Sequence, residues 1–305
     1  MPLANQEDLS SVARLSRVRK SLGGTPVLVD FDLAIRAGEV TALLGANGAG
    51  KTTSVSLLTG RLSPDSGTAT LFGLDPRRPA ARQRMGVMLQ SAGLPDVMTV
   101  AEMVTLQSGY YADPRPLAET LALAGLADLA DRRCGTLSGG QGRRVQYALS
   151  ICGRPDLLVL DEPTAAMDRA SARSLWSTVR EHADHGAAVL LTSHDLAEAD
   201  ALADRIVLMD RGRIIADDTP AAIRAQAGGS VIRCRSSLTP AIASTLPAVR
   251  DAEMEGADLR IGTNDAAATV RALLSADAEV SGLRVADATL EDAIAAVMTE
   301  ERIAA

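Results

Sequence analysis

A glycine-rich stretch at residues 45–52 has the composition of a phosphate-binding loop. It lies between an apolar run at residues 40–44 and an expected helix, and its small residues let backbone N–H groups turn toward phosphate oxygens. Lys51 is placed to reach the terminal phosphates, and the hydroxyl of Thr52 to ligate Mg²⁺. A chance match to a loose pattern is the alternative, and the flanking strand and helix argue against it. The residues that we expect to contact phosphate are Gly45, Ala46, Asn47, Gly48, Ala49, Gly50, Lys51, Thr52 and Thr53.

The use of lysine supports a chemical role for Lys51. The chain has two lysines, Lys20 and Lys51, and arginine fills the other basic positions. A compact ammonium fits where the planar fork of arginine does not, which favours a specific requirement at this position.

Two adjacent carboxylates, Asp161 and Glu162, follow an apolar run at residues 157–160. Such a run is typical of a strand buried on both faces of a parallel sheet, with the phosphate loop beside its end. One carboxylate would hold Mg²⁺ while the other orients or deprotonates water. A solvated loop after the strand is the alternative, but a phosphate loop elsewhere in the chain requires a second magnesium contact.

A second motif suited to anions comprises Ser138, Gly139, Gly140 and Gln141. It precedes an expected helix and offers a hydroxyl and unhindered N–H groups at the helix N-terminus. The sequence therefore predicts two phosphate sites and one hydrolytic centre.

The elements that must position these motifs follow from hydrophobic spacing. Alternating apolar residues at 27–35 (Val27, Val29, Phe31, Leu33 and Ile35) predict a half-buried strand in an antiparallel sheet. Apolar runs at residues 157–160, 187–191 and 205–209 alternate with helical stretches, which predicts an α/β core.

A glycine-containing boundary at residues 227–230 predicts a second domain. Beyond it, periodicity predicts the order strand, helix, strand, strand, helix, strand, followed by a closing helix. The βαββαβ part is compatible with a small ferredoxin-like layer. We expect a tail at residues 1–11, a larger domain at 12–227 and a small α+β domain at 228–305.

Composition narrows the class of protein. A net charge of −7 argues against a bare nucleic-acid binder, and we expect the pairs Arg132-Arg133 and Arg143-Arg144 to be solvated faces or dimer contacts. No apolar run is long enough to span a bilayer, and the N-terminus lacks a signal-peptide pattern. We therefore expect a cytoplasmic protein whose membrane role requires a partner.

The order of the motifs resembles the ATP-binding subunit of an ABC transporter over about residues 12–227. The motifs that carry the resemblance are the phosphate loop, Gln90, the motif at 138–141, the pair Asp161-Glu162, and His194. The resemblance implies a P-loop NTPase of ABC type, with a mixed sheet core, an antiparallel β subdomain and a helical signature subdomain. It also implies ATP and Mg²⁺ as ligands.

The resemblance assigns roles to single residues. Glu162 would be the catalytic glutamate that polarises water, and His194 the switch histidine that contacts the γ-phosphate, with Lys51 completing the catalytic set. Asp161 would be the Walker B aspartate, and Gln90 the Q-loop glutamine. Together with Thr52, these last two would hold Mg²⁺.

The resemblance also implies partners. Two subunits of such proteins pack head to tail, so the signature at residues 138–141 of one subunit closes over ATP held by the other. Asp168 would be the D-loop aspartate of that dimer, which is either a homodimer or a heterodimer with a second ATP-binding subunit. A separate transmembrane permease would hold the chain at the inner face of the cell membrane, through residues 90–111. No direct contact with nucleic acid is expected.

The chain departs from the family at Leu22, where an aromatic residue usually stacks on adenine. Stacking of aromatic side chains on bases is worth about 1–3 kcal/mol in nucleic-acid complexes, so ATP binding is expected to weaken on the order of ten- to hundred-fold.

The segment at residues 289–294 resembles the closing helix of bacterial drug-resistance exporter ATPases, such as daunorubicin-export subunits. It favours an ATP-hydrolysing exporter subunit for a drug-like or other hydrophobic compound. One alternative is a soluble ABC ATPase that acts on a nucleic-acid, ribosomal or protein assembly. The acidic net charge and the exporter-like segment at residues 289–294 argue against it. Another is a regulatory subunit that binds ATP without hydrolysis, against which Lys51, Asp161, Glu162 and His194 argue.

Overall fold

The computed structural model describes residues 11–90, 93–193, 195–227 and 229–304, which form two compact units. The units divide between Asp217 and Asp218. Helix α8 (Pro220–Ala227) belongs to the second unit, where it packs against the closing helix α11 (Leu290–Ala304). Within the described residues, no helix combines the length and apolar character that crossing a bilayer requires.

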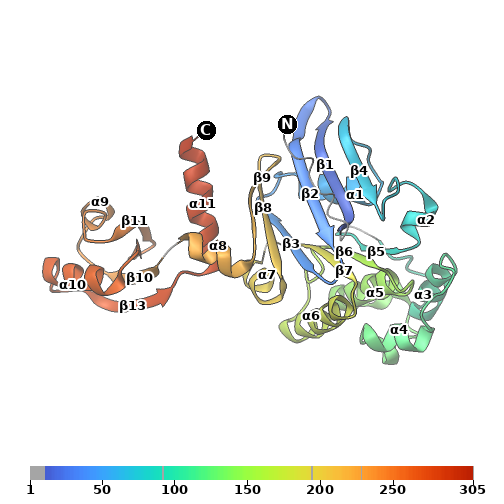
Figure 1. The fold of residues 1–305 in the computed structure, drawn as a ribbon. Helices are drawn as coiled ribbons and strands as arrows, with labels where there is room; N and C mark the ends of the chain where they lie inside the picture. The colour runs from blue at the N-terminus through green and yellow to red at the C-terminus, as the bar shows by residue number, and fades with distance from the viewer. Residues whose placement is uncertain (1–10, 91–92, 194, 228, 305) are drawn as a thin grey trace. The chain divides into compact units, whose positions relative to one another are not determined.

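A mixed sheet forms the centre of the first unit (Figure 1). Its strands, in spatial order, are β5 (Met85–Met88), β6 (Leu157–Asp161), β7 (Ala188–Thr192), β3 (Val40–Gly45), β8 (Arg205–Asp210) and β9 (Arg213–Asp218). The strands from β5 to β8 pair in parallel, and the short turn at residues 211–212 makes β9 antiparallel to β8. The phosphate loop after β3 and the carboxylates at the end of β6 therefore lie at the same edge of the sheet.

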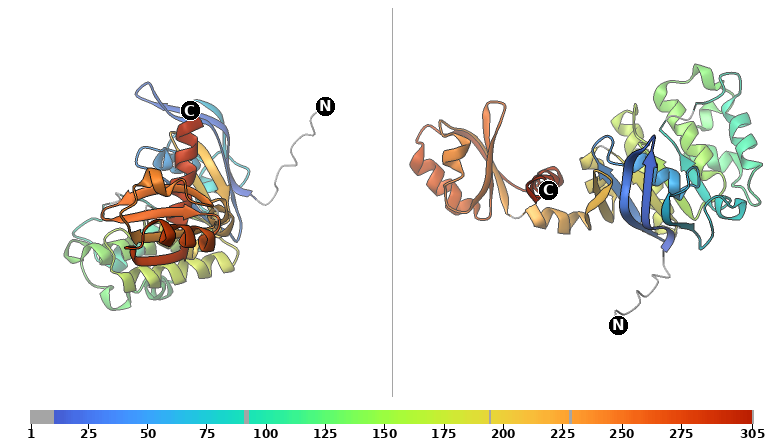
Figure 2. Two further views of the ribbon diagram at one scale, coloured as in Figure 1. Left: turned by 90° about the vertical axis from the view of Figure 1, so that its left-hand side faces the viewer. Right: turned by 90° about the horizontal axis from the view of Figure 1, so that it is seen from above.

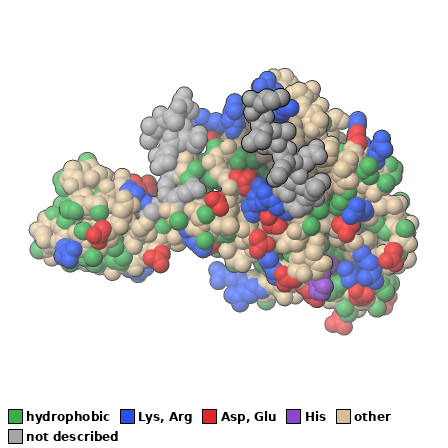
Figure 3. All heavy atoms as spheres, in the orientation of Figure 1, with side chains coloured by type: hydrophobic (Ala, Val, Ile, Leu, Met, Phe, Trp, Pro, Cys, Tyr) green, Lys and Arg blue, Asp and Glu red, His purple; other side chains and the backbone are tan. Residues whose placement is uncertain are grey.

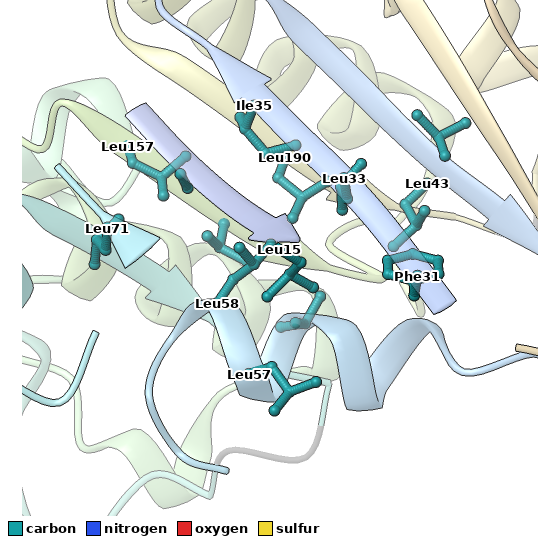
Figure 4. Packing of buried hydrophobic residues seen from close by; sticks show 14 of the residues in the cluster. Leu15, Phe31, Leu33, Ile35, Leu43, Leu57, Leu58, Leu71, Leu157 and Leu190 are labelled. Carbon is teal, nitrogen blue, oxygen red and sulfur yellow. The ribbon is translucent and has the colours of Figure 1, made fainter. Parts of the chain in front are cut away.

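An antiparallel sheet of β2 (Thr25–Arg36), β1 (Ser11–Leu22) and β4 (Ser66–Leu71) covers helix α1 (Lys51–Leu58), which also contacts the mixed sheet. Figure 4 shows Leu15 of β1 beside Leu58 of α1, and Phe31 of β2 beside Leu43 of β3. These side chains form one core, so the antiparallel sheet holds α1 and its preceding loop in place.

The alternation expected in β2 is only partly right. Phe31, Leu33 and Ile35 are buried as predicted, but Leu28 is buried in place of its neighbours Val27 and Val29. Asp30 has a left-handed φ of 49°, and the pairing with β1 shifts register beside it. The resulting bulge reverses which side chains face the core.

Helices α3 (Val100–Ser108), α4 (Leu117–Leu123) and α5 (Gly139–Ile151) form the expected helical subdomain of the first unit. Figure 2 shows the green helices α3 and α4 gathered apart from the blue antiparallel sheet. A capping box starts α3: Glu102 N–H donates to the Thr99 hydroxyl at 3.2 Å, and Thr99 N–H donates to the Glu102 carboxylate at 2.8 Å. The longer helix α6 (Arg169–Asp184) joins β6 to β7.

The second unit contains an antiparallel sheet in the order β11 (Val249–Glu255), β12 (Asp258–Thr263), β10 (Ser230–Arg235), β13 (Ser281–Asp287). Short α9 (Pro240–Ala243) and α10 (Ala266–Ala276) contribute Ala243 and Leu273 to a core with Ile232 and Ile261 of the sheet. With its first and last strands adjacent, this is the ferredoxin-like layer that the sequence suggests.

Charged residues are mixed in sign over the visible surface in Figure 3. Many arginines pair with carboxylates; Arg205, for example, donates to Asp217 at 2.5 Å.

Candidate nucleotide-binding site

The phosphate loop needs glycine at two positions for steric reasons. Gly45 and Gly50 have φ values of 153° and 110°, which side chains rarely adopt. A Cβ on Gly45 would lie 2.4 Å from the carbonyl oxygen of Met209, and one on Gly50 would lie 2.7 Å from the Leu28 side chain. Gly50 is also the N-cap of α1 and places no side chain over the first N–H groups of that helix, which suits them to bind an anion.

Lys51 lies within the curve of this loop. Its ammonium donates hydrogen bonds to the carbonyl oxygens of Gly45 at 2.6 Å and Ala46 at 3.2 Å. Burial lowers the pKa of Lys51, while the nearby carboxylates of Glu162 and Asp161 act in the opposite direction. The structure therefore places a partly desolvated cation between the loop and the two acids.

One pocket brings the loop together with Gln90 and the acidic pair. Its lining residues are Val27, Ala46, Asn47, Gly48, Gly50, Lys51, Thr52, Thr53, Gln90, Asp161 and Glu162. These residues come from β2, the phosphate loop, α1 and the ends of β5 and β6. The grouping is the one that the motifs predict for phosphate binding beside a hydrolytic centre.

The acidic pair is oriented by Thr192 at the end of the neighbouring strand β7. The fully buried Thr192 hydroxyl donates to the carboxylate of Asp161, which is 4% exposed. It also accepts a hydrogen bond from the N–H of Glu162 at 3.2 Å. Glu162 has a left-handed φ of 53°, a strained conformation of the kind that occurs at functional sites when the surroundings enforce it.

The expected magnesium ligands, Thr52, Gln90 and Asp161, all line this pocket. A hydroxyl, an amide oxygen and a carboxylate are hard oxygen donors of the kind that Mg²⁺ prefers. Among the residues that the structure describes, no cluster of three or more His, Cys, Asp or Glu could hold a metal alone. The donor set fits a magnesium ion that completes its coordination with water and substrate phosphates.

The signature residues lie apart from this pocket, at the start of α5. Ser138 and Gln141 form a reciprocal cap: Gln141 N–H donates to the Ser138 hydroxyl at 3.3 Å, and Ser138 N–H donates to the Gln141 side chain at 3.0 Å. Gly139 and Gly140 pack beside Ala166. None of the described residues that line the phosphate pocket belongs to the signature.

Three further residues that the sequence singles out lie outside the phosphate pocket or outside the described residues. Asp168 caps α6 by accepting from Ser171 N–H at 2.9 Å. Leu22 is 44% exposed at the β1–β2 turn, where it pairs with Thr25. His194 lies outside the described residues.

Sequence reasoning missed two residues of the site. Thr192 was visible only as a polar residue that ends an apolar run. Arg143, expected on a solvated face or at a dimer contact, is instead 8% exposed and donates to the carbonyl oxygen of Glu162 at 2.8 Å. Its proximity to the signature was the available signal, but its acceptors come from distant parts of the chain.

Fold and site together define a P-loop ATPase. Comparison with known proteins identifies its family: ABC transporter, matched at residues 28–165. The daunorubicin/doxorubicin resistance ATP-binding protein DrrA of Streptomyces peucetius is 42% identical over 223 residues, which are 71% of this chain and 68% of the relative. A Nod factor export ATP-binding protein I of Burkholderia orbicola is 38% identical over 223 residues, 70% of this chain and 73% of the relative. A solved ATP-binding subunit of an ABC transporter aligns with a TM-score of 0.67 at 25% identity, over 71% of this chain and 93% of that one.

The chain belongs to the ABC transporter family. It is an ATP-binding subunit that hydrolyses ATP to drive transport, as the motifs predict. Membership implies a membrane permease as partner and association of two ATP-binding subunits.

Proposed function

We propose that this subunit powers the efflux of a drug-like or other hydrophobic compound through a separate membrane permease. The names of its relatives support this assignment, since they are resistance and export proteins. The permease would hold the subunit at the inner face of the cell membrane.

The separation of the signature from the phosphate pocket carries the proposal of a head-to-tail dimer. The pocket offers the phosphate loop, Gln90 and the acidic pair, while residues 138–141 lie elsewhere on the same subunit. A signature from a second subunit would complete each site, with a helix N-terminus facing the phosphates. Asp168, which starts α6, would lie at this dimer interface.

The chemistry follows from the groups that line the pocket. Lys51 neutralises phosphate charge, and the Glu162 carboxylate polarises the attacking water. Thr52, Gln90 and Asp161 would hold Mg²⁺, which stabilises the charge on the phosphate oxygens. Thr192 keeps the acidic pair oriented through its two hydrogen bonds. His194 would contact the γ-phosphate.

An exposed apolar surface on α3 is the candidate docking site for the permease. A shallow pocket there is lined by Met98, Ala101, Glu102, Thr105 and Leu106. Leu106 is 53% exposed, and Val97 and Tyr110, which flank α3 in the sequence, are 77% and 69% exposed. Exposed apolar groups gathered at one place are typical of protein-binding surfaces, and these lie in the segment 90–111 that the motif order predicts as transporter-facing.

The test of the hydrolytic assignment is Glu162→Gln. This variant should keep ATP binding, lose turnover and form an ATP-dependent dimer that elutes early in size-exclusion chromatography. Glu119→Gln, at a half-exposed ion pair with Arg115, is the matched control and should retain wild-type turnover. Wild-type hydrolysis by Glu162→Gln would exclude the water-polarising role.

Docking through α3 is tested separately by co-purification of an integral membrane protein with the tagged chain. Leu106→Asp should reduce the amount of that protein recovered while the ATPase activity of the isolated subunit persists. Recovery of a ribosomal or nucleic-acid assembly instead would favour the soluble ABC ATPase alternative.

A further inference from the structure

Arg143 is a buried arginine that contacts the backbone of two residues that line the phosphate pocket, Gln90 and Glu162. Arg143 is 8% exposed and lies on α5, two positions after the signature. The guanidinium donates to the following acceptors: Glu162 O at 2.8 Å, Leu89 O at 3.1 Å, Gln90 O at 3.2 Å, Ala165 O at 3.4 Å and the Gln146 amide oxygen at 2.8 Å.

These contacts explain how a buried cation is tolerated here. A guanidinium carries five N–H donors in a fixed plane, and burial is costly unless these donors are satisfied. Backbone carbonyls and one amide supply the acceptors, and the carboxylates of Asp161 and Glu162 supply opposing charge. Burial lowers the pKa of Arg143, while these two carboxylates act to raise it, and the side chain stays protonated.

The acceptors belong to the segments that must be aligned for hydrolysis. Glu162 provides the water-polarising carboxylate and sits at a left-handed φ of 53°, which neighbouring contacts must enforce. Gln90 follows β5 and lines the same pocket. Ala165 lies on the path to Asp168. A single planar group therefore connects α5 to the loops after β5 and β6.

We propose that Arg143 is a positioning residue that holds Glu162 and Gln90 in register with the signature helix. When the signature of one subunit docks onto ATP in a second subunit, Arg143 would align Glu162 in the first subunit, the one that provides the signature. The inference rests on the proposed head-to-tail function and adds a physical link between its two nucleotide sites.

The test separates positioning from simple support of the fold. Arg143→Gln removes the planar fork, and Arg143→Lys keeps the charge but offers only three donors from one atom. Arg84→Gln is the matched control, because Arg84 forms an exposed ion pair with Asp156 at the opposite end of β5. The purified full-length variants are compared for kcat, KM, ATP affinity and melting temperature.

We expect Arg143→Gln to lower kcat about tenfold to hundredfold, since a small misplacement of a catalytic group has effects of this size. The KM and the dissociation constant for ATP should stay within about twofold of wild type, because the phosphate loop is untouched. Arg143→Lys should fall between wild type and Arg143→Gln, and Arg84→Gln should match wild type.

Wild-type kcat in Arg143→Gln would overturn the proposal, as would a loss of ATP affinity and melting temperature in parallel with kcat in both Arg143 variants. The wild-type and Glu162→Gln proteins run in the same assay test the hydrolytic assignment itself. Failure of that assignment appears as turnover by Glu162→Gln, whereas failure of the present proposal appears only in the Arg143 variants.

Discussion

The ammonium nitrogen of Lys51 lies 2.6 Å from the carbonyl oxygen of Gly45, the first residue of its own phosphate loop. This contact curves the side chain back over the loop and places its charge beside the acidic pair. The position of the cation is thus set by the backbone of the loop that it serves.

We predict that Lys51→Met abolishes ATP hydrolysis and weakens ATP binding by at least about tenfold, since a desolvated charge on phosphate is worth more than 1.4 kcal/mol. Titration with a fluorescent ATP analogue measures the change. The matched control is Lys20→Met, which removes the other lysine and an ion pair to the half-exposed Asp65. Lys20 is not among the residues that line the phosphate pocket, so the control should bind ATP like wild type. Equal affinities of the two variants would refute the role of Lys51.

Leu22→Tyr is expected to tighten ATP binding by on the order of ten- to hundred-fold through stacking on adenine. Leu22 is 44% exposed at the β1–β2 turn, so the larger side chain has room without disturbing the core. Isothermal titration with ATP and with an abasic triphosphate distinguishes stacking from a general effect. Leu22→Ala serves as the control for loss of the native side chain. An unchanged affinity for ATP in Leu22→Tyr would place the adenine elsewhere.

The buried pair of Arg260 and Asp292 ties α11 to the sheet of the second unit. The two side chains are 5% and 6% exposed and lie 2.9 Å apart. Asp292→Asn should destabilise this unit by about 1–3 kcal/mol, because Arg260 would lose its most buried counter-charge but keep its ion pairs with more exposed carboxylates. Urea unfolding measures the change. Glu291→Gln, exposed on the same turn, is the control and should change stability by less than about 0.5 kcal/mol.

The pair of Arg260 and Asp292 also predicts that the stability of the second unit falls at acid pH. Burial pushes the pKa of Asp292 upward, but hydrogen bonds from Thr289 and Arg260 outweigh it and the pKa is lowered in the folded chain. The stabilisation is therefore complete above the ordinary carboxyl pKa of about 4 and declines as the pH falls through the folded value. Urea midpoints between neutral and acidic pH should fall more steeply for wild type than for Asp292→Asn. Parallel pH profiles would contradict this assignment.

Local patterns in the sequence predict most of the fold and the parts of the site that come from continuous motifs. The helix after the phosphate loop and the buried strand before Asp161 each depend on neighbouring residues, and both occur in the structure as expected. The bulge at Asp30 reverses which side chains are buried, because a left-handed residue interrupts the period of two.

The contacts of Arg143 and Thr192 could not be predicted from local sequence patterns. Arg143 bonds to carbonyl groups 19 to 54 positions away, and Thr192 meets Asp161 across 31 positions. A charged residue on a helix has the same local signature whether water or distant carbonyls solvate it. Only the parallel order of β5, β6 and β7 brings these partners together.

The first and last strands of the second unit, β10 and β13, are neighbours in its sheet. The chain enters the four-stranded layer from α8 and leaves it toward α11, two helices that pack against each other. The chain therefore enters and leaves the sheet on adjacent strands, and the whole layer is an insertion between two helices that contact each other. We therefore expect that the layer can be replaced by another whose ends have similar spacing, while α8 and α11 stay packed together.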